Sequence, residues 1–174
     1  MWLLFLLACG GPLGAPDDTA VDGGCFSNPG AVEVGGGSLT YEPVADGTDL
    51  TMVHGPQGGW HVLAGARFTD VSPIVEIHYT IEARSPEGEV ALVSDNSYRV
   101  QMVQDVECGG FYPGMYGYLN VTALVEGERD TPPELIAGHE LVLTMAVTDQ
   151  EGRTATDALT GIAALDPMDE DMEE

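Results

Sequence analysis

Apolar and polar residues alternate along much of the middle of the chain, with the period of two that a half-buried β-strand requires. In residues 75–83 the odd positions are apolar and the even positions are polar. The same pattern runs through residues 60–68 and 141–148, and a weaker form of it runs through residues 98–102 and 119–125. The pattern predicts a strand in each of these five segments.

Turns that contain glycine or proline separate these segments, and no stretch of ten residues repeats its apolar positions with helical spacing. One short helical turn is expected over residues 131–138, which proline opens and glycine ends. Further short strands are expected near residues 31–34, 39–44, 50–54, 89–94 and 153–163. Eight or nine short strands joined by turns predict an all-β domain, built as a two-sheet antiparallel sandwich.

Residues 141–156, LVLTMAVTDQEGRTAT, resemble the final hairpin of immunoglobulin-like and fibronectin-III-like domains. In those domains a strand that ends in V-T-D is followed by a tight turn with acidic residues and glycine. The resemblance implies an immunoglobulin-like sandwich of about 7–9 strands. It concerns architecture and brings no activity with it.

The first eight residues carry no charge and lead into Cys9. This run is far shorter than the roughly 20 apolar residues of a membrane-spanning helix, and it is typical of the apolar part of an export signal. Leu6-Leu7-Ala8-Cys9 resembles the lipobox of bacterial lipoproteins. The resemblance implies cleavage after Ala8, palmitate-type lipidation of Cys9 and anchoring in the cell envelope. The alternative is a buried N-terminal strand, which the following Gly10-Gly11-Pro12 disfavours.

Composition divides the chain into four parts. A signal peptide is expected over residues 1–8, a lipidated tether rich in Gly and Asp over 9–25, the sandwich over 26–165, and a disordered acidic tail over 166–174. This plan has a looser likeness to uncharacterised lipoproteins of GC-rich, predatory-type bacteria, and that likeness implies no activity. In Gram-negative bacteria the non-acidic Gly10 after the lipidated cysteine is compatible with sorting to the outer membrane.

Charge limits the partners. The 174 residues carry 29 acidic and five basic side chains, all of the latter arginine, for a formal net charge of −24. A polyanion is repelled by phosphate backbones and by anionic lipid headgroups, which argues strongly against a nucleic-acid partner. The absence of lysine excludes Schiff-base catalysis and a P-loop.

The three cysteines are expected to have two different roles, lipidation and disulfide formation. If Cys9 takes lipid, Cys25 and Cys108 remain as an even pair in an oxidising compartment, and we expect a disulfide between them. The alternative is two unrelated thiols. Neither cysteine lies in a C-x-x-C pair, so a metal site is the poorer interpretation.

Three histidines form a candidate metal site. His54 and His61 flank a glycine-rich turn, and His78 lies on the polar face of the next strand, so their imidazoles could converge on zinc or copper. The alternative is that all three are half-exposed residues on polar faces, and no metal or other cofactor is assigned. Asp149, Glu151 and Asp157 surround one turn, but their spacing matches no known calcium loop.

No catalytic motif is complete. His139-Glu140 begins like the H-E-x-x-H zinc motif, but Leu143 occupies the position of the second histidine. G-x-S-x-G and a G-x-G-x-x-G that opens a helix are both absent from the sequence. The sequence therefore predicts a protein that is not an enzyme, with an unrecognised hydrolase as an alternative.

The segment Cys108–Tyr118 combines four aromatic residues with four glycines and carries no charge. Aromatic side chains in a glycine-rich loop are typical of binding surfaces. We therefore expect a recognition loop here, in which the contacts are made by Phe111, Tyr112, Tyr116 and Tyr118. The alternative is that these rings cap one end of the core.

Together these features predict a lipid-anchored envelope protein with a non-catalytic binding, adhesion or structural role. Its expected partners are the membrane, through the lipid on Cys9, and an envelope protein or polysaccharide. The first alternative is a metal-binding envelope protein that uses His54, His61 and His78. The second is the unrecognised hydrolase.

Overall fold

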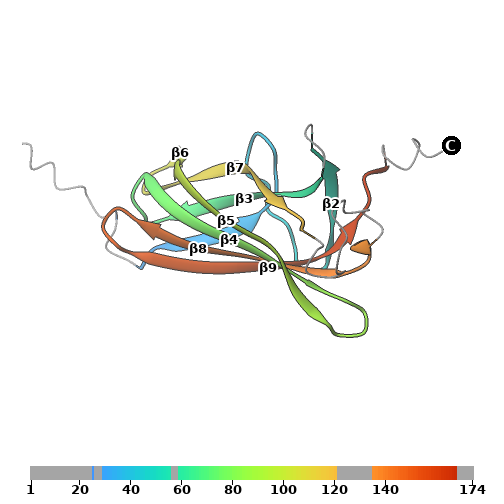
Figure 1. The fold of residues 1–174 in the computed structure, drawn as a ribbon. Coiled ribbons are helices and arrows are strands. Elements are labelled where there is room, and N and C mark those ends of the chain that lie inside the picture. The colour runs from blue at the N-terminus through green and yellow to red at the C-terminus, as the bar shows by residue number, and fades with distance from the viewer. Residues whose placement is uncertain (1–24, 26–28, 56–58, 121–134, 168–174) are drawn as a thin grey trace, which may run out of the picture.

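The computed structural model describes residues 25, 29–55, 59–120 and 135–167. Within these residues the chain is almost entirely β-strand, which confirms the all-β prediction (Figure 1). The strands are β1 (Ala31–Gly35), β2 (Thr48–His54), β3 (Trp60–Thr69), β4 (Ile74–Arg84), β5 (Val90–Gln101), β6 (Val103–Val106), β7 (Gly109–Tyr118), β8 (Glu140–Asp149) and β9 (Thr154–Ala164). None of the helical structure in the described part is long and apolar enough to cross a membrane.

The expected signal peptide, the lipidation site Cys9 and the tether up to residue 24 lie outside the described residues. Residues 168–174 of the expected acidic tail also lie outside the described residues. These assignments stay predictions.

The strands form one curled sheet in the order β5-β4-β8-β9-β2-β3-β7-β6, and β1 pairs with the second half of β3. All neighbours are antiparallel except β2 and β9, which are parallel. In Figure 1 the sheet curls so that β3 and β7 lie above β8 and β9, as a half-barrel. The two-sheet, immunoglobulin-like sandwich is not confirmed, because β2 hydrogen-bonds to β3 and to β9 and so joins the two halves into one sheet.

The core lies inside the curl. The odd positions of β4 are all buried, as their alternation predicted, and they lie beside the buried apolar positions of the neighbouring β8. Across the curl, Tyr79 and Ile81 of β4 lie against Gly117 of β7. Burial of such side chains contributes roughly 1.5–3 kcal/mol each. The largest fully buried side chains are Tyr79, Phe68, Met52, Ile77, Ile81, Met115, Leu119, Ile136, Leu141, Leu143, Met145 and Val62.

Three of the expected strands differ from the structure. Residues 39–44 form no strand, and only an isolated bridge joins Gly36 to Glu42 there, because this segment follows the end of β1 and folds back over it. Residues 89–94 and 98–102 are not separate strands, since β5 runs through both.

Two other expectations are tested only in part. The weak alternation at 119–125 begins after β7 has ended, and its residues 121–125 lie outside the described part. Of the helical turn expected over 131–138, only residues 135–138 are described. They form a turn that ends at Gly138 with a positive φ of 78°.

The hairpin β8–β9 is present where residues 141–156 predicted it, and a buried carboxylate organises its turn. Asp149 accepts hydrogen bonds from the backbone N–H groups of Glu151 (3.0 Å) and Arg153 (2.8 Å) and from Arg153 Nε (2.7 Å). It also accepts one from the backbone N–H of Ser72 (3.1 Å), which lies between β3 and β4. A single side chain therefore closes the turn and ties it to a second loop.

Candidate functional site

The glycine-rich aromatic segment is not a loop. Residues 109–118 form β7, which pairs with β3 along most of its length, so the predicted recognition loop is wrong as a loop. Pro113, which cannot donate a ladder hydrogen bond, falls at the irregularity of this pairing between Ala64 and Ala66. The strand therefore tolerates a proline at this position.

The glycines of β7 serve close packing against the core. A Cβ at Gly117 would lie 2.8 Å from the Tyr79 hydroxyl, and one at Gly110 would lie 3.0 Å from the Met102 sulfur. Both glycines are buried. They do not bring the backbone close to a ligand, as a recognition loop would require.

The four aromatic rings of β7 divide into two pairs. Phe111 and Tyr112 are half-buried, and Tyr112 packs against the core, which agrees with the capping alternative. Tyr116 and Tyr118 are 53% and 44% exposed and point outward, because Met115 and Gly117 between and beside them point inward.

His61 lies between the two exposed rings. It is directly opposite Tyr118 in the β3–β7 register, and its ring centroid is 5.4 Å from that of Tyr118 and 5.4 Å from that of Tyr116. Both contacts are edge-on, the arrangement that aromatic quadrupoles favour. Tyr118 also lies against Gly59, where a Cβ would be 3.0 Å from its hydroxyl. We call His61, Tyr116 and Tyr118 the tyrosine–histidine face.

The three histidines do not converge. His54 is opposite Trp60 in the β2–β3 register, and successive residues of a strand point to opposite faces, so His54 and His61 lie on opposite faces of this hairpin. The His54 ring contacts Trp60 at 5.1 Å instead. His78 lies on β4, four strands away from β3 in the sheet order, with its Nε2 2.8 Å from Asp95 Oδ1. The convergence that the alternative of a histidine metal site requires is therefore absent.

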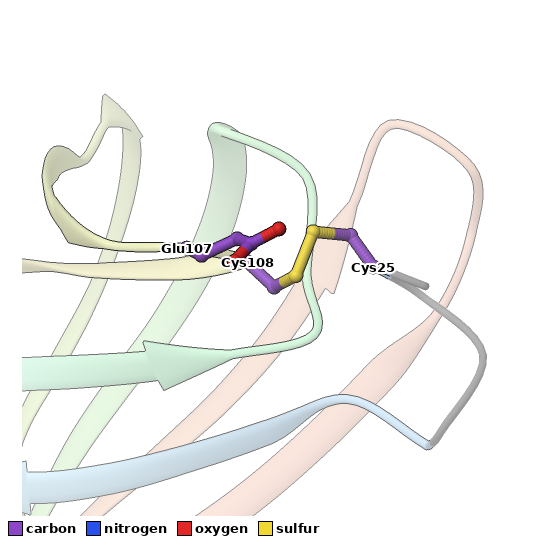
Figure 2. A group of neighbouring side chains, drawn as sticks. All are labelled: Cys25, Glu107 and Cys108. Carbon is purple, nitrogen blue, oxygen red and sulfur yellow. A yellow bond between two sulfur atoms is a disulfide. The ribbon is translucent and has the colours of Figure 1, made fainter. Parts of the chain in front are cut away.

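Among the described residues, one group of three potential metal ligands is close enough to share an ion: Cys25, Glu107 and Cys108 (Figure 2). Metals bind the cysteine thiolate, and both of these sulfurs are consumed by a disulfide. Two of the acidic residues around the β8–β9 turn are also engaged with protein groups, since Asp149 pairs with Arg153 and Asp157 accepts a hydrogen bond from the backbone N–H of Val34 (2.8 Å).

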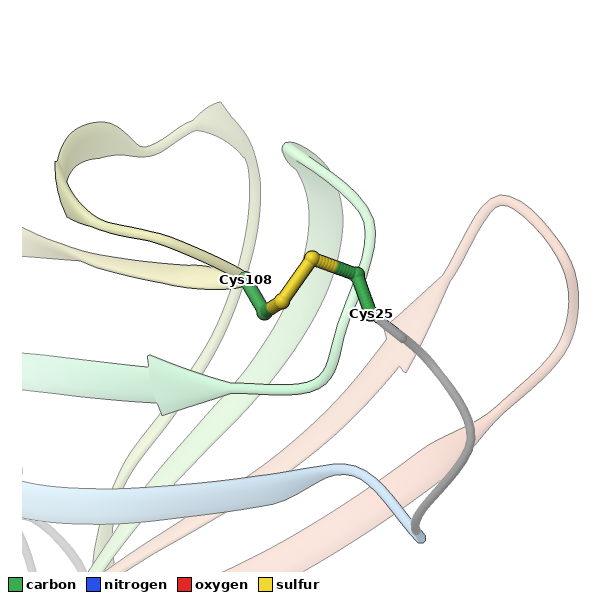
Figure 3. Close-up of a disulfide and its surroundings, with 2 residues drawn as sticks. All are labelled: Cys25 and Cys108. Carbon is green, nitrogen blue, oxygen red and sulfur yellow. A yellow bond between two sulfur atoms is a disulfide. The ribbon is translucent and has the colours of Figure 1, made fainter. Parts of the chain in front are cut away.

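The disulfide is the one that the cysteine count predicted. Cys25 and Cys108 are linked with Cα atoms 5.0 Å apart (Figure 3). Cys108 lies in the turn between β6 and β7, where its φ is positive, and its carbonyl accepts a hydrogen bond from the backbone N–H of Asp70 at 2.7 Å. The link thus joins the start of the described chain to a turn at one end of the half-barrel.

The His78–Asp95 pair lies on an open strand face. The two side chains are 54% and 59% exposed, and Ser97 lies directly across from His78 on β5. Electrostatic catalysis depends on a site that excludes water and presents oriented donors. A pair exposed to this degree lends no support to the hydrolase alternative.

A groove of about 270 Å³ separates β5 from the end of β7. Two hydrogen bonds span this seam: the Tyr98 hydroxyl donates to the Tyr116 carbonyl (2.5 Å), and the Asn120 backbone N–H donates to the Val93 carbonyl (2.7 Å). The residue that comes first on β5, Val93, pairs with the one that comes last on the other side, Asn120, as in an antiparallel arrangement. β5 and β7 are nevertheless not neighbours in the sheet. The groove lies between these two contacts, and its lining is Leu92, Val93, Ser94, Asp95, Asn96, Tyr118 and Asn120.

No protein-family model matches this chain, and no curated protein matches it. Among solved structures, the chain is similar to the CooA pilin subunit from enterotoxigenic Escherichia coli, with 9% sequence identity and a TM-score of 0.41. The match covers 78% of this chain and 99% of the pilin chain.

Proposed function

We propose that this chain is a lipid-anchored, non-catalytic binding protein of the bacterial cell envelope, and that it makes contact through the tyrosine–histidine face. The observation that supports this proposal is the exposure of Tyr116 and Tyr118 around His61. Tyrosines are enriched where proteins bind one another, because each ring supplies a large contact area with few rotatable bonds.

The setting of the two rings supports the same proposal. His61 and Gly59 hold Tyr118 in place, so binding costs little side-chain entropy. The tyrosine–histidine face carries no carboxylate, whereas the whole chain carries a net charge of −24. A partner with negative charges is repelled by the rest of the molecule, whereas a neutral partner can contact this uncharged face.

A double variant tests this face. We expect Tyr116→Ala with Tyr118→Ala to weaken cosedimentation of the detergent-solubilised full chain with Gram-negative envelope fragments by about 30-fold, because truncating two anchoring rings costs roughly 2 kcal/mol or more. The thermal midpoint should stay nearly unchanged, since both rings are exposed. Val103→Ala, which truncates another exposed apolar side chain on β6, is the matched control. A lower midpoint with unchanged cosedimentation would show that the rings are structural.

A separate experiment tests the lipid anchor, for which the support is the lipobox resemblance of Leu6-Leu7-Ala8-Cys9. We expect Cys9→Ala to move the protein from the membrane fraction to the soluble fraction, because two or more acyl chains anchor stably and none remains in the variant. Membrane fractionation with immunodetection measures the change. Retention of the variant in the membrane fraction, at the level of the parent chain, would overturn the anchor.

A further inference from the structure

We propose that the groove between β5 and the end of β7 binds a neutral saccharide, with Tyr118 as its aromatic wall. This inference rests on the proposed binding function and names the chemical class of its ligand. It places the contact at the rim of the tyrosine–histidine face, where Tyr118 belongs to both surfaces.

A β-bulge supplies the polar side of the groove. Ile81 pairs with Ser94 and Glu82 with Leu92, so Val93 is the extra residue of β5. As a result Val93 and Ser94 are both buried, although consecutive strand residues normally point to opposite faces. Bulges recur beside functional sites because they re-aim side chains in this way.

The polar side chains of the groove are partly preorganised. Asn96 Nδ2 donates a hydrogen bond to Ser94 Oγ at 2.7 Å, which fixes the amide plane and leaves its carbonyl oxygen and second N–H available. Asp95, between these two residues, points to the other face of β5, where it pairs with His78. The amide of Asn120 stands at the opposite wall, beyond the hydrogen bond that joins its backbone to Val93.

This set of groups matches a sugar better than other small ligands. Sugar hydroxyls both donate and accept, as do the amides and the hydroxyl that line the groove, and the apolar face of a sugar ring fits against an aromatic ring such as that of Tyr118. The net charge of −24 disfavours phosphates, sulfates and uronic acids. A volume of about 270 Å³ is at the small end of ligand sites, which suits one or two sugar units of a longer chain.

Titration with free oligosaccharides tests the inference. The full chain in detergent, labelled with ¹⁵N, is titrated with the hexamers of cellulose, chitin, maltose, xylan and mannan, and with oligogalacturonate as the acidic probe. We expect at least one neutral hexamer to shift the amide signals of residues 92–96, with a dissociation constant between about 10 µM and 5 mM, and oligogalacturonate to leave them unchanged.

Two variants and a control assign the binding to the groove. Tyr118→Ala and Asn96→Ala should each weaken the affinity at least about tenfold, whereas Tyr116→Ala, an exposed ring outside the groove lining, should change it less than about threefold. The inference is overturned if no neutral hexamer binds, if oligogalacturonate binds as well, or if Tyr116→Ala weakens binding as much as Tyr118→Ala. Envelope cosedimentation that depends on both tyrosines, without saccharide binding, would sink this inference alone and leave the proposed function standing. Saccharide binding without cosedimentation would overturn the proposed envelope-binding function and leave the saccharide site standing.

Discussion

Replacement of Cys25 and Cys108 together by serine is expected to lower the free energy of unfolding by about 4 kcal/mol. The disulfide joins residues 83 positions apart, and a cross-link of that length removes much of the conformational entropy of the unfolded chain. The partly exposed cysteines contribute little to the core, so the loss should come almost entirely from the unfolded state. Urea unfolding of the variant and of the oxidised parent chain measures the difference.

Chemical reduction of the parent chain provides the control for this experiment, because it breaks the link without altering any side chain volume. Reduced parent and double variant should unfold at the same urea concentration. Intact mass of the oxidised protein should show no alkylatable Cys25 or Cys108 thiol under non-reducing conditions. A stability difference below about 1 kcal/mol would contradict the entropic role of the disulfide.

The second large effect is expected at Asp149. We expect Asp149→Asn to lower the free energy of unfolding by about 3 kcal/mol, because the variant loses the charge pair between the buried Asp149 carboxylate and Arg153 and turns an amide N–H₂ toward backbone donors. Asp95→Asn is the matched control: that carboxylate is 59% exposed, and its loss should cost less than about 1 kcal/mol. Equal losses in the two variants would contradict the importance of the buried turn.

The same carboxylate makes stability depend on pH. Burial of Asp149 favours its neutral form, but hydrogen bonds from Ser72 and Arg153, together with the Arg153 charge, outweigh burial and hold the pKa of Asp149 below its usual value. The unfolded pKa is about 3.9, so this contribution is fully present above about pH 4 and is lost as the pH falls toward the lower folded pKa. Urea unfolding at several pH values should therefore show a steeper acid loss in the parent chain than in Asp149→Asn.

Alternation was sufficient to predict the strands whose two faces differ most. In β4 every odd position is buried and every even position is not, and the predicted segment 75–83 falls one residue short of each end of the strand. Alternation did not predict the glycine-rich strand β7, because glycine and proline are rare in strands. Gly110 and Gly117 also leave two inner positions of β7 without an apolar side chain. Only the neighbours that press against these two glycines explain why they are there.

The sequence pattern does not predict which strands pair with one another. Alternation tells which face of a strand is buried, but it does not tell that β2 pairs in parallel with β9, which turns a sandwich into a half-barrel. The sequence pattern also does not predict the groove between β5 and the end of β7. Ser94 and Asn96 point toward this groove because of the bulge at Val93. The polar run Ser94-Asp95-Asn96-Ser97, which links the segments 89–94 and 98–102 expected to be strands, was the available signal.

The role of Asp149 depends on a partner that the sequence pattern does not reveal. The sequence places acidic residues around one turn, with a spacing that matches no known calcium loop, and the structure gathers polar groups there. The decisive residue is Arg153, four positions later, which satisfies the carboxylate and leaves it no role as a cation ligand. A basic residue at this distance across a tight turn was visible in the sequence, but the side chains' approach was not.

The disulfide also determines how the domain carries mechanical load. A pull on the chain before residue 25 reaches the fold through the covalent link at Cys108, in the turn that leads into β7, and not through the first strand. β1 therefore bears no tension, and its hydrogen bonds to β3 and its contact with Asp157 are not peeled apart one by one. With the link reduced, the same pull would enter at Ala31 and open the β1–β3 ladder first. A domain held at its N-terminal side is in this way secured at the turn between β6 and β7, at one edge of its sheet, and β1 does not carry the force.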